Sequence, residues 1–197
     1  GPQVHAGRPQ PNPLGGNLLT NPGAEAGAAS DDGSPVAIPN WNTFAGFTAV
    51  KYGADGFPGT DEADRISGGA NFFAGGGQAD ASRALQKIDV SKWSDLIDGK
   101  KLRLKARVWQ AGFEDQEDNG QLRVQFLNDK GKLVGTMRLR KVAGTNFEFE
   151  KVQSIKDVPE GTRSIRVLLI ANRVTGSFAD AYFDNIEVKL VRRTIQG

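Results

Sequence analysis

Hydrophobic and polar residues alternate along several segments of this chain, a pattern typical of β-strands with one buried face. The clearest segment covers residues 101–110, KLRLKARVWQ, and residues 121–127 repeat the alternation. Other segments with strand character are residues 17–20, 47–52, 83–90, 132–142, 147–155, 163–172 and 179–190. Strands at roughly ten-residue spacing, with Gly and Asp turns between them, predict an all-β sandwich or barrel.

Turn and helix signals complete this pattern. Residues 128–131, Asn-Asp-Lys-Gly, predict a hairpin turn. Only residues 91–97, SKWSDLI, have helical character, with Ser91 as the expected N-terminal cap. The aromatic residues expected in the core are Trp41, Phe44, Phe72, Phe73, Phe126, Phe149 and Phe183, with Trp93 packed on the helical turn.

The chain is expected to form a single β-sandwich domain over residues 17–191, with a short C-terminal tail at residues 192–197. Residues 1–16 contain four prolines, which prevent regular strand pairing, so we expect an extended N-terminal tail. This tail is either a disordered linker or a segment ordered against its own domain or a neighbouring molecule.

Composition and charge narrow the possible functions. The 197 residues include 25 Lys and Arg against 23 Asp and Glu, which gives a net charge of +2. This small charge, together with the lack of a known nucleic-acid-binding motif in the sequence, argues against nucleic-acid binding. There is no cysteine, and the single histidine, His5, lies in the tail, which leaves no material for disulfides or for Ser-His-Asp catalysis. No apolar run approaches the ~20 residues of a membrane-spanning helix.

Three segments together carry a resemblance to a known family. They are LLTNPGAEAG at residues 18–27, ANFFAGGG at residues 70–77, and residues 162–188, which end in FDNIEV. Their order and spacing resemble the galactose-binding-like jelly-roll modules of bacterial secreted proteins, which include carbohydrate-binding modules. The resemblance implies an antiparallel jelly roll that is not an enzyme, is secreted or held at the cell surface, and binds a polysaccharide or glycoconjugate.

The same resemblance implies a structural calcium ion. The acid after the NPG turn and the aspartate of the last strand correspond to Glu25 and Asp184. Calcium takes six to eight oxygen ligands from carboxylates and backbone carbonyls, and it would join the first turn to the last strand. The alternative is that Glu25 is a solvated turn acid and Asp184 ends a strand.

The outward side chains of the middle strands are the candidate ligand-binding residues. Alternation places Arg103, Lys105, Arg107 and Trp109 on one face, and we expect Arg123 and Arg138 to join them from the following strands. Arginine binds carboxylates and sulfates through two parallel hydrogen bonds, and a tryptophan can stack on a sugar ring, so an anionic polysaccharide is the expected ligand. The alternative is an ordinary polar outer face. Tyr52, Phe57 and Phe113, in or near loops at an edge of the sandwich, form a second-choice sugar platform.

Two other segments and two other functions stay open. The acidic loop at residues 114–118 is either solvated or a second site for calcium or sugar hydroxyls, and the long loop at residues 54–69 is a candidate lid or rim. The alternative function is a structural or adhesive subunit of an extracellular assembly that docks on a neighbour through the N-terminal tail. A glycosidase, which needs two carboxylates across a cleft, is the third hypothesis.

Overall fold

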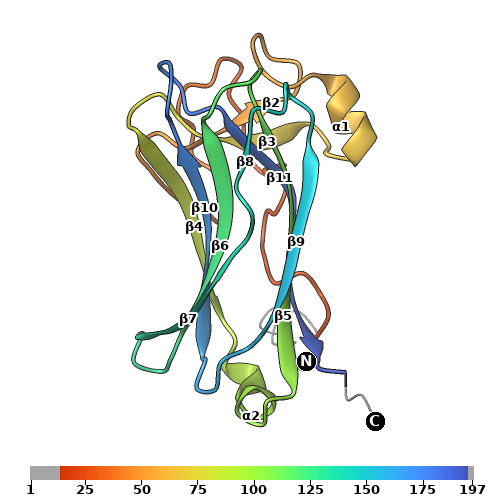
Figure 1. Cartoon of the computed structure of the whole chain (residues 1–197), viewed down its shortest axis with the longest axis vertical. Coiled ribbons are helices and arrows are strands. Elements are labelled where there is room, and N and C mark those ends of the chain that lie inside the picture. Colours follow the sequence, from red (N-terminus) through yellow and green to blue (C-terminus); the bar gives the residue numbers. More distant parts are fainter. Residues whose placement is uncertain (1–13, 195–197) are drawn as a thin grey trace, which may run out of the picture.

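Two antiparallel sheets pack face to face in a computed structural model, which describes residues 14–194 (Figure 1). The six-stranded sheet has the order β1-β4-β10-β6-β7, with β8 paired to β6, and the five-stranded sheet has the order β2-β3-β11-β5-β9. The fold is therefore an all-β sandwich of the jelly-roll type, as the alternation and the resemblance predicted. The strands are β1 (Asn42–Phe44), β2 (Thr48–Lys51), β3 (Asn71–Ala74), β4 (Ala81–Asp89), β5 (Leu102–Gly112), β6 (Asn119–Leu127), β7 (Leu133–Arg138), β8 (Val142–Ala143), β9 (Glu150–Asp157), β10 (Ser164–Asn172) and β11 (Ala181–Arg192).

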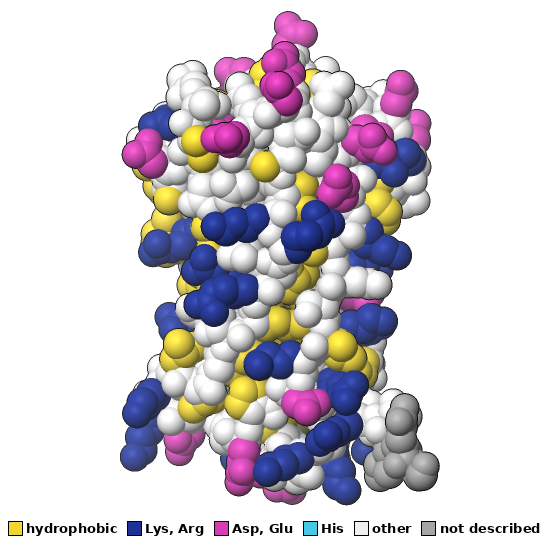
Figure 2. Space-filling view, in the orientation of Figure 1, with side chains coloured by type: hydrophobic (Ala, Val, Ile, Leu, Met, Phe, Trp, Pro, Cys, Tyr) yellow, Lys and Arg dark blue, Asp and Glu magenta, His cyan; other side chains and the backbone are white. Residues whose placement is uncertain are grey.

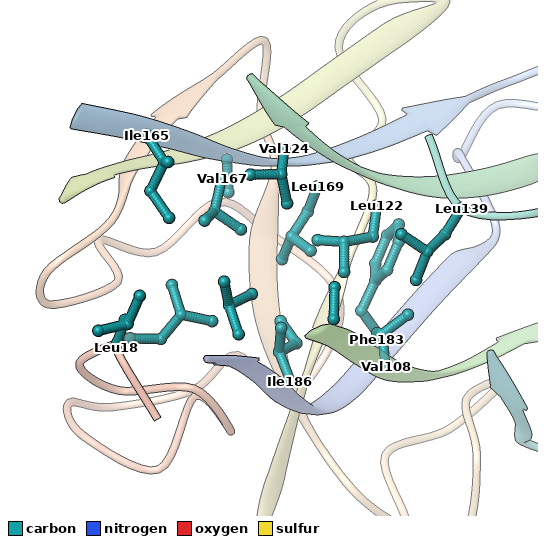
Figure 3. Close-up of a cluster of buried hydrophobic side chains, with 14 of the residues drawn as sticks. Leu18, Val108, Leu122, Val124, Leu139, Ile165, Val167, Leu169, Phe183 and Ile186 are labelled. Atoms are coloured by element: carbon teal, nitrogen blue, oxygen red, sulfur yellow. The ribbon is translucent and has the colours of Figure 1, made fainter. Parts of the chain in front are cut away.

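The core fills the space between the two sheets. Every second side chain of β5 is buried there, and the inward side chains of β6 and β10 come from the opposite sheet. Figure 3 shows these side chains pointing toward Phe183, Ile186 and Val108 of the other layer. Burial of apolar surface of this extent is the main force that holds the sheets together.

A second apolar cluster lies on the outer side of the five-stranded sheet, at one end. Helix α1 (Thr60–Ile66) buries Ala63 and Ile66 in this cluster, together with Tyr52 and Phe72. The predicted long loop at residues 54–69 therefore contains a helix and covers the outer face of the five-stranded sheet at that end (Figure 1).

The predicted helical turn exists as a 3-10 turn, η1 (Ser91–Trp93), followed by α2 (Ser94–Asp98). Ser91 is not its N-cap, because Ser91 is already the first helical residue. Instead, the backbone N–H and the hydroxyl of Ser91 both donate to the Asp89 carboxylate, at 2.8 and 2.6 Å. The hairpin turn at residues 128–131 is confirmed by the Asn128 N–H, which donates to the Lys132 carbonyl at 2.9 Å.

Other differences from the predictions concern the ends of the chain and one aromatic residue. Residues 17–20 do not form a named strand, although Leu18 donates a backbone hydrogen bond to Val188 of β11. Phe44 is not in the core, because the residue is 42% exposed on edge strand β1. The predicted N-terminal tail lies largely outside the described residues, and Gly15 donates a backbone hydrogen bond to Leu190 at 2.9 Å.

Candidate functional site

The outer face of the five-stranded sheet carries four of the predicted binding residues, on β5. Two of them have ion-pair partners on neighbouring strands: Arg103 contacts Asp157 at 2.9 Å, and Arg107 contacts Glu187 at 3.9 Å. Lys105 is exposed between these two arginines. The charges of this face are therefore largely satisfied within the sheet.

Trp109, the predicted sugar platform of this face, is half-buried and covered by helix α1. The Arg65 guanidinium lies 6.0 Å from the centre of the Trp109 ring. Arg65 is fixed there by hydrogen bonds to the Glu62 carboxylate at 2.8 Å and to the Phe149 carbonyl at 2.7 Å. One face of the indole is thus occupied by the chain itself.

The second-choice platform is also unsuited to stacking. Tyr52 is buried within the second apolar cluster, so its ring is not accessible to a ligand. Phe113 packs edge-to-face on Phe147, with ring centres 5.3 Å apart, and lies partly buried against the same cluster.

Arg123 and Arg138 do not share a face with the β5 residues, contrary to the prediction. They lie on β6 and β7, which belong to the six-stranded sheet, whereas β5 belongs to the five-stranded sheet. Alternation fixes which residues of one strand point outward, but two outer faces of a sandwich point in opposite directions. The six predicted binding residues of the middle strands thus divide between two opposite surfaces.

The outer face of the six-stranded sheet is hollowed into a groove of about 470 Å³, which we call the arginine groove. Strands β1, β4, β6 and β10 line it, with arginines along a floor of aliphatic side chains. A second hollow of about 530 Å³ lies toward the β6–β7 hairpin and is lined by Lys87 and Arg163 among others. The lining residues of the arginine groove are Phe44, Arg83, Leu85, Arg123, Gln125, Arg166, Leu168 and Ile170.

The arginine groove is strongly basic. Its three arginines and the flanking residues Lys87 and Arg138 have no ion-pair partner among residues 14–194. In the view of Figure 2, Lys and Arg side chains lie mainly over the strands, and acidic side chains gather mainly at the end that carries α1. This surface therefore has a net positive charge that the described part of the chain does not neutralise.

An aromatic residue closes one end of the arginine groove. The Arg83 guanidinium lies 4.5 Å from the centre of the Phe44 ring, within the distance of a cation–π contact. Sequence reasoning missed this pair because Phe44 was expected in the core. Its position on edge strand β1, directly opposite Arg83 of β4, turns the ring to the outer face.

The predicted metal ligands Glu25 and Asp184 approach each other around three glycines. A methyl group at Gly23 would lie 3.4 Å from Asp184 Oδ1 and 4.0 Å from Glu25 Oε1. A methyl group at Gly68 would lie 2.6 Å from Asp184 Oδ2, and one at Gly69 would lie 2.5 Å from Glu25 Oε1. A Cβ at position 68 or 69 would clash with a carboxylate oxygen, whereas one at position 23 would make ordinary van der Waals contact.

Asp184 is fully buried without a basic partner among the described residues. It accepts hydrogen bonds from the Tyr52 hydroxyl and from the Asn185 N–H. Burial, and the nearby charge of Glu25, raise the pKa of the Asp184 carboxyl to about 8. A buried carboxylate is stable in its charged form only where hydrogen bonds or a cation compensate its charge, and carboxylate oxygens are ligands that calcium prefers.

The β-bulge in β11 places Asp184 in this position. The pairing register between β11 and β5 shifts between Asp184 and Glu187, and Asn185 adopts a left-handed backbone conformation with φ of 48°. The extra residue lets Asp184 lie beside Tyr52 of the outer cluster while Ile186, two positions later, is buried in the core between the sheets. The FDNI sequence of the last strand thus has a structural role.

The predicted calcium site offers two acidic side chains, Glu25 and Asp184. Among residues 14–194 no group of three or more His, Cys, Asp or Glu side chains is arranged to hold a metal ion. Two carboxylates fit a calcium site only where backbone carbonyls or waters supply the remaining oxygens.

The acidic loop at residues 114–118 has one buried member, Asp118. Its Oδ1 accepts hydrogen bonds from the N–H groups of Val174 and Thr175, at 2.7 and 2.9 Å, and its Oδ2 accepts one from Asp180 at 3.1 Å. Asp118 therefore fixes the β10–β11 loop, which is a structural role for this segment.

The fold and the groove define the class of the molecule: an all-β sandwich with an open, basic groove on one outer face. No model of a protein family matches the sequence, and no curated protein matches it. None of the helices within residues 14–194 has the length and apolarity to cross a membrane.

Solved structures with a similar fold exist at low sequence identity. The active domain of bacteriophage CBA120 tailspike protein 4 matches with a TM-score of 0.56 and 14% identity, over 89% of this chain and 21% of the other. The arabinose-bound MgGH51 α-L-arabinofuranosidase matches with a TM-score of 0.55 and 11% identity, over 90% of this chain and 27% of the other. The xylan-binding domain CBM22-1 of Paenibacillus barcinonensis Xyn10C matches with a TM-score of 0.47 and 11% identity, over 84% of this chain and 94% of the other. This chain therefore spans 21% and 27% of the first two proteins, with which it shares a fold.

Proposed function

We propose that this chain is a non-catalytic, extracellular glycan-binding module whose binding face is the arginine groove. The observation that carries the proposal is an open groove on a sheet surface, with arginines that lack ion-pair partners above an aliphatic floor. The proposal rests on the groove, because one fold serves many functions.

The lining of the arginine groove suits a sugar chain. The aliphatic side chains of Leu85, Leu168 and Ile170 are only partly buried and offer an apolar floor for the C–H face of a sugar ring. The Gln125 amide and the arginine forks offer hydrogen bonds to hydroxyl groups. Phe44 adds an exposed aromatic ring at the end of the groove, where a terminal ring can stack.

A structural calcium ion belongs to the same proposal. Glu25 and Asp184 would hold it, and the ion would supply the positive charge that the buried carboxylate of Asp184 lacks. This chain's own residues prepare the position: Tyr52 orients one oxygen of Asp184, and the N–H groups of Ala70 and Asn71 orient the Glu25 carboxylate at 3.0 and 3.2 Å.

Affinity electrophoresis through gels that contain neutral xylan, neutral β-glucan or polygalacturonate tests the proposal. The double variant Phe44→Ala/Leu168→Ser changes the arginine groove, and Ile155→Ser removes a 48% exposed side chain from the opposite sheet as a control. We expect the groove variant to bind at least about tenfold more weakly, because lost apolar contact of this kind is worth about 1.4 kcal/mol or more. Equal binding by the groove variant and the wild type would contradict the proposal.

The alternative function, a structural or adhesive subunit that docks through the N-terminal tail, depends on residues outside the described part of the chain. It stays a prediction, and a failure to bind any glycan in the gels above would favour it.

A further inference from the structure

Two pairs of basic residues stand directly opposite each other on the outer face of the six-stranded sheet. Lys87 of β4 is the register partner of Arg166 of β10, and Arg123 of β6 is the register partner of Arg138 of β7. Directly opposed residues have Cβ atoms about 5 Å apart, and like charges in such positions destabilise a sheet. The sheet therefore holds four cations in an arrangement that is unfavourable in the absence of an anion.

No acidic side chain compensates these pairs from within the groove. The outward neighbours in the same rows are Leu85, Leu168, Gln125 and Thr136, all of them uncharged. The nearest acid on these strands is Asp89, at the end of β4, where its carboxylate is engaged by Ser91. The charge of Asp89 acts on Lys87, whereas Arg123, Arg138 and Arg166 have no ion-pair partner among residues 14–194.

The opposite sheet shows the contrasting arrangement. There Arg103 stands opposite Asp157, and Arg107 stands opposite Glu187, so these arginines have acids as register partners and form ion pairs with them. Lys105 and Lys189 are also register partners on that sheet, but Lys189 has an ion pair with Glu187 at 3.3 Å. The two basic pairs of the six-stranded sheet have no acid within ion-pair distance among residues 14–194.

The arginines of the groove are also prepared to bind an anion. The Arg123 Nε donates to the Gln121 side chain at 2.9 Å, which fixes the guanidinium and leaves its terminal N–H groups for a ligand. The Arg166 Nε is buried without a hydrogen-bond partner in the described chain, as is the Arg107 Nε on the opposite sheet. The terminal N–H groups of a guanidinium can bind a carboxylate or sulfate through charge-assisted hydrogen bonds.

From these observations we propose that the arginine groove recognises acidic glycans, with one carboxylate or sulfate group bound at each like-charge pair. This inference rests on the proposed glycan-binding function and names its substrate class. The pairs are two strands apart across the sheet and two residues apart along it. They are therefore separated by roughly 12 Å, given about 4.8 Å between strands and about 3.3 Å per residue. One ligand that reaches both pairs must carry its acidic groups on separate sugar units, as a polyanionic polysaccharide does.

The lining of the groove favours a glycan over a nucleic acid. Sheets that bind single-stranded nucleic acids stack successive bases on several aromatic side chains. The arginine groove has one aromatic residue, Phe44, at its end, and aliphatic side chains at its centre.

Equilibrium binding to three probes tests the inference: a galacturonate oligosaccharide, a sulfated dextran oligosaccharide and neutral xylohexaose. The test variant is Arg123→Gln/Arg138→Gln. The control is Lys105→Gln/Lys151→Gln, which removes the same charge from exposed positions on the opposite sheet. We expect at least one acidic probe to bind the test variant at least tenfold more weakly than it binds wild type. The same probe should bind the control variant with an affinity within twofold of that of wild type. Its affinity for wild type should fall steeply with added salt. The two acidic probes distinguish carboxylate from sulfate as the preferred group.

Several results would overturn the inference. Equal losses of affinity for the acidic probes in the test and control variants would indicate nonspecific charge attraction. Tight binding of a duplex DNA of equal charge, with the same affinity as the acidic glycans, would also contradict the inference. Xylohexaose binding that matches acidic binding and is insensitive to the arginine changes would also overturn it, while the proposed glycan-binding function would stand. Absence of binding to all three probes would contradict both the inference and the proposed glycan-binding function.

Thermal unfolding of the test variant checks that it folds. We expect its unfolding midpoint to be no lower than that of wild type, because a like-charge pair has been removed.

Discussion

The phenol of Tyr52 donates a hydrogen bond to the carboxylate of Asp184, across 132 positions of the chain. Tyr52 follows β2 and Asp184 lies on β11, so the bond joins the first part of the five-stranded sheet to its last strand. Burial disfavours the charged form of both groups, and it raises the pKa of the Tyr52 hydroxyl far above its usual value. The other oxygen of the carboxylate accepts a hydrogen bond from the Asn185 N–H at 2.7 Å.

Tyr52→Phe is expected to lower the free energy of unfolding by about 1–3 kcal/mol, because it leaves a buried acceptor with one donor fewer. Urea unfolding in EDTA measures the change. Tyr182→Phe is the matched control, since Tyr182 donates at 2.7 Å to Asp180, which is only half-buried and open to water. We expect the control to lose less, about 0.5–1.5 kcal/mol. Equal losses would contradict a special role for the bond to Asp184.

Calcium is expected to stabilise the protein through Glu25 and Asp184. At a hundredfold excess over its Kd, calcium would add about 2.7 kcal/mol. That corresponds to a rise in Tm of roughly 5–11 °C for a domain of this size. EDTA should reverse the rise. Calorimetry of Asp184→Asn and Glu25→Gln should show little response to calcium, whereas Asp129→Asn, a change at an exposed position, should respond as wild type does. An unchanged response in Asp184→Asn would exclude this site.

Asp118→Asn is expected to loosen the β10–β11 loop. The buried Asp118 carboxylate accepts three backbone hydrogen bonds from that loop, and an amide has only one acceptor oxygen. Hydrogen exchange of residues 174–180 should become faster, and the free energy of unfolding should fall by about 1.5–3 kcal/mol. The exposed Asp115→Asn serves as the control. Unchanged exchange in the loop of the Asp118 variant would show that other contacts fix it.

Asp180 is expected to give the protein a pH-dependent stability. Burial, opposed by the bond from Tyr182 and reinforced by Asp118, raises the pKa of the Asp180 carboxyl from 3.8 to about 6. The folded state thus holds this proton more tightly than the unfolded state. The stabilisation is complete below about pH 4 and is lost as pH rises to about 6. Asp180→Asn should flatten this part of the Tm profile, and a slope equal to that of wild type would contradict the assignment.

The strands were predictable because their two faces differ in chemistry. Residues 101–110 alternate strictly, and β5 follows them, with Leu102, Leu104 and Val108 buried in the core. Helix α1 was not predicted, because seven residues, TDEADRI, are too few to show a helical period. It is stable through tertiary contacts, in which Glu62 and Arg65 bind the backbone of Phe149.

The candidate site was only partly predictable, because the alternation of residues does not show which strands share a sheet. The sequence shows that Arg107 and Arg123 point outward from their strands, but only the strand order shows that the strands belong to different sheets. Phe44 was expected in the core from its residue type, and its place on a short edge strand exposes it. Glu25 and Asp184 were named from resemblance; they lie near each other around Gly23, Gly68 and Gly69, and the calcium ion itself stays a prediction.

The most direct test of the account is to map the amide chemical shifts of the isotope-labelled protein during titration with a galacturonate oligosaccharide. The account predicts that the largest changes lie on β4, β6 and β10, around Arg83, Arg123 and Arg166. Saturable changes confined to β5 and β9, on the opposite sheet, would contradict the assignment of the arginine groove as the binding face.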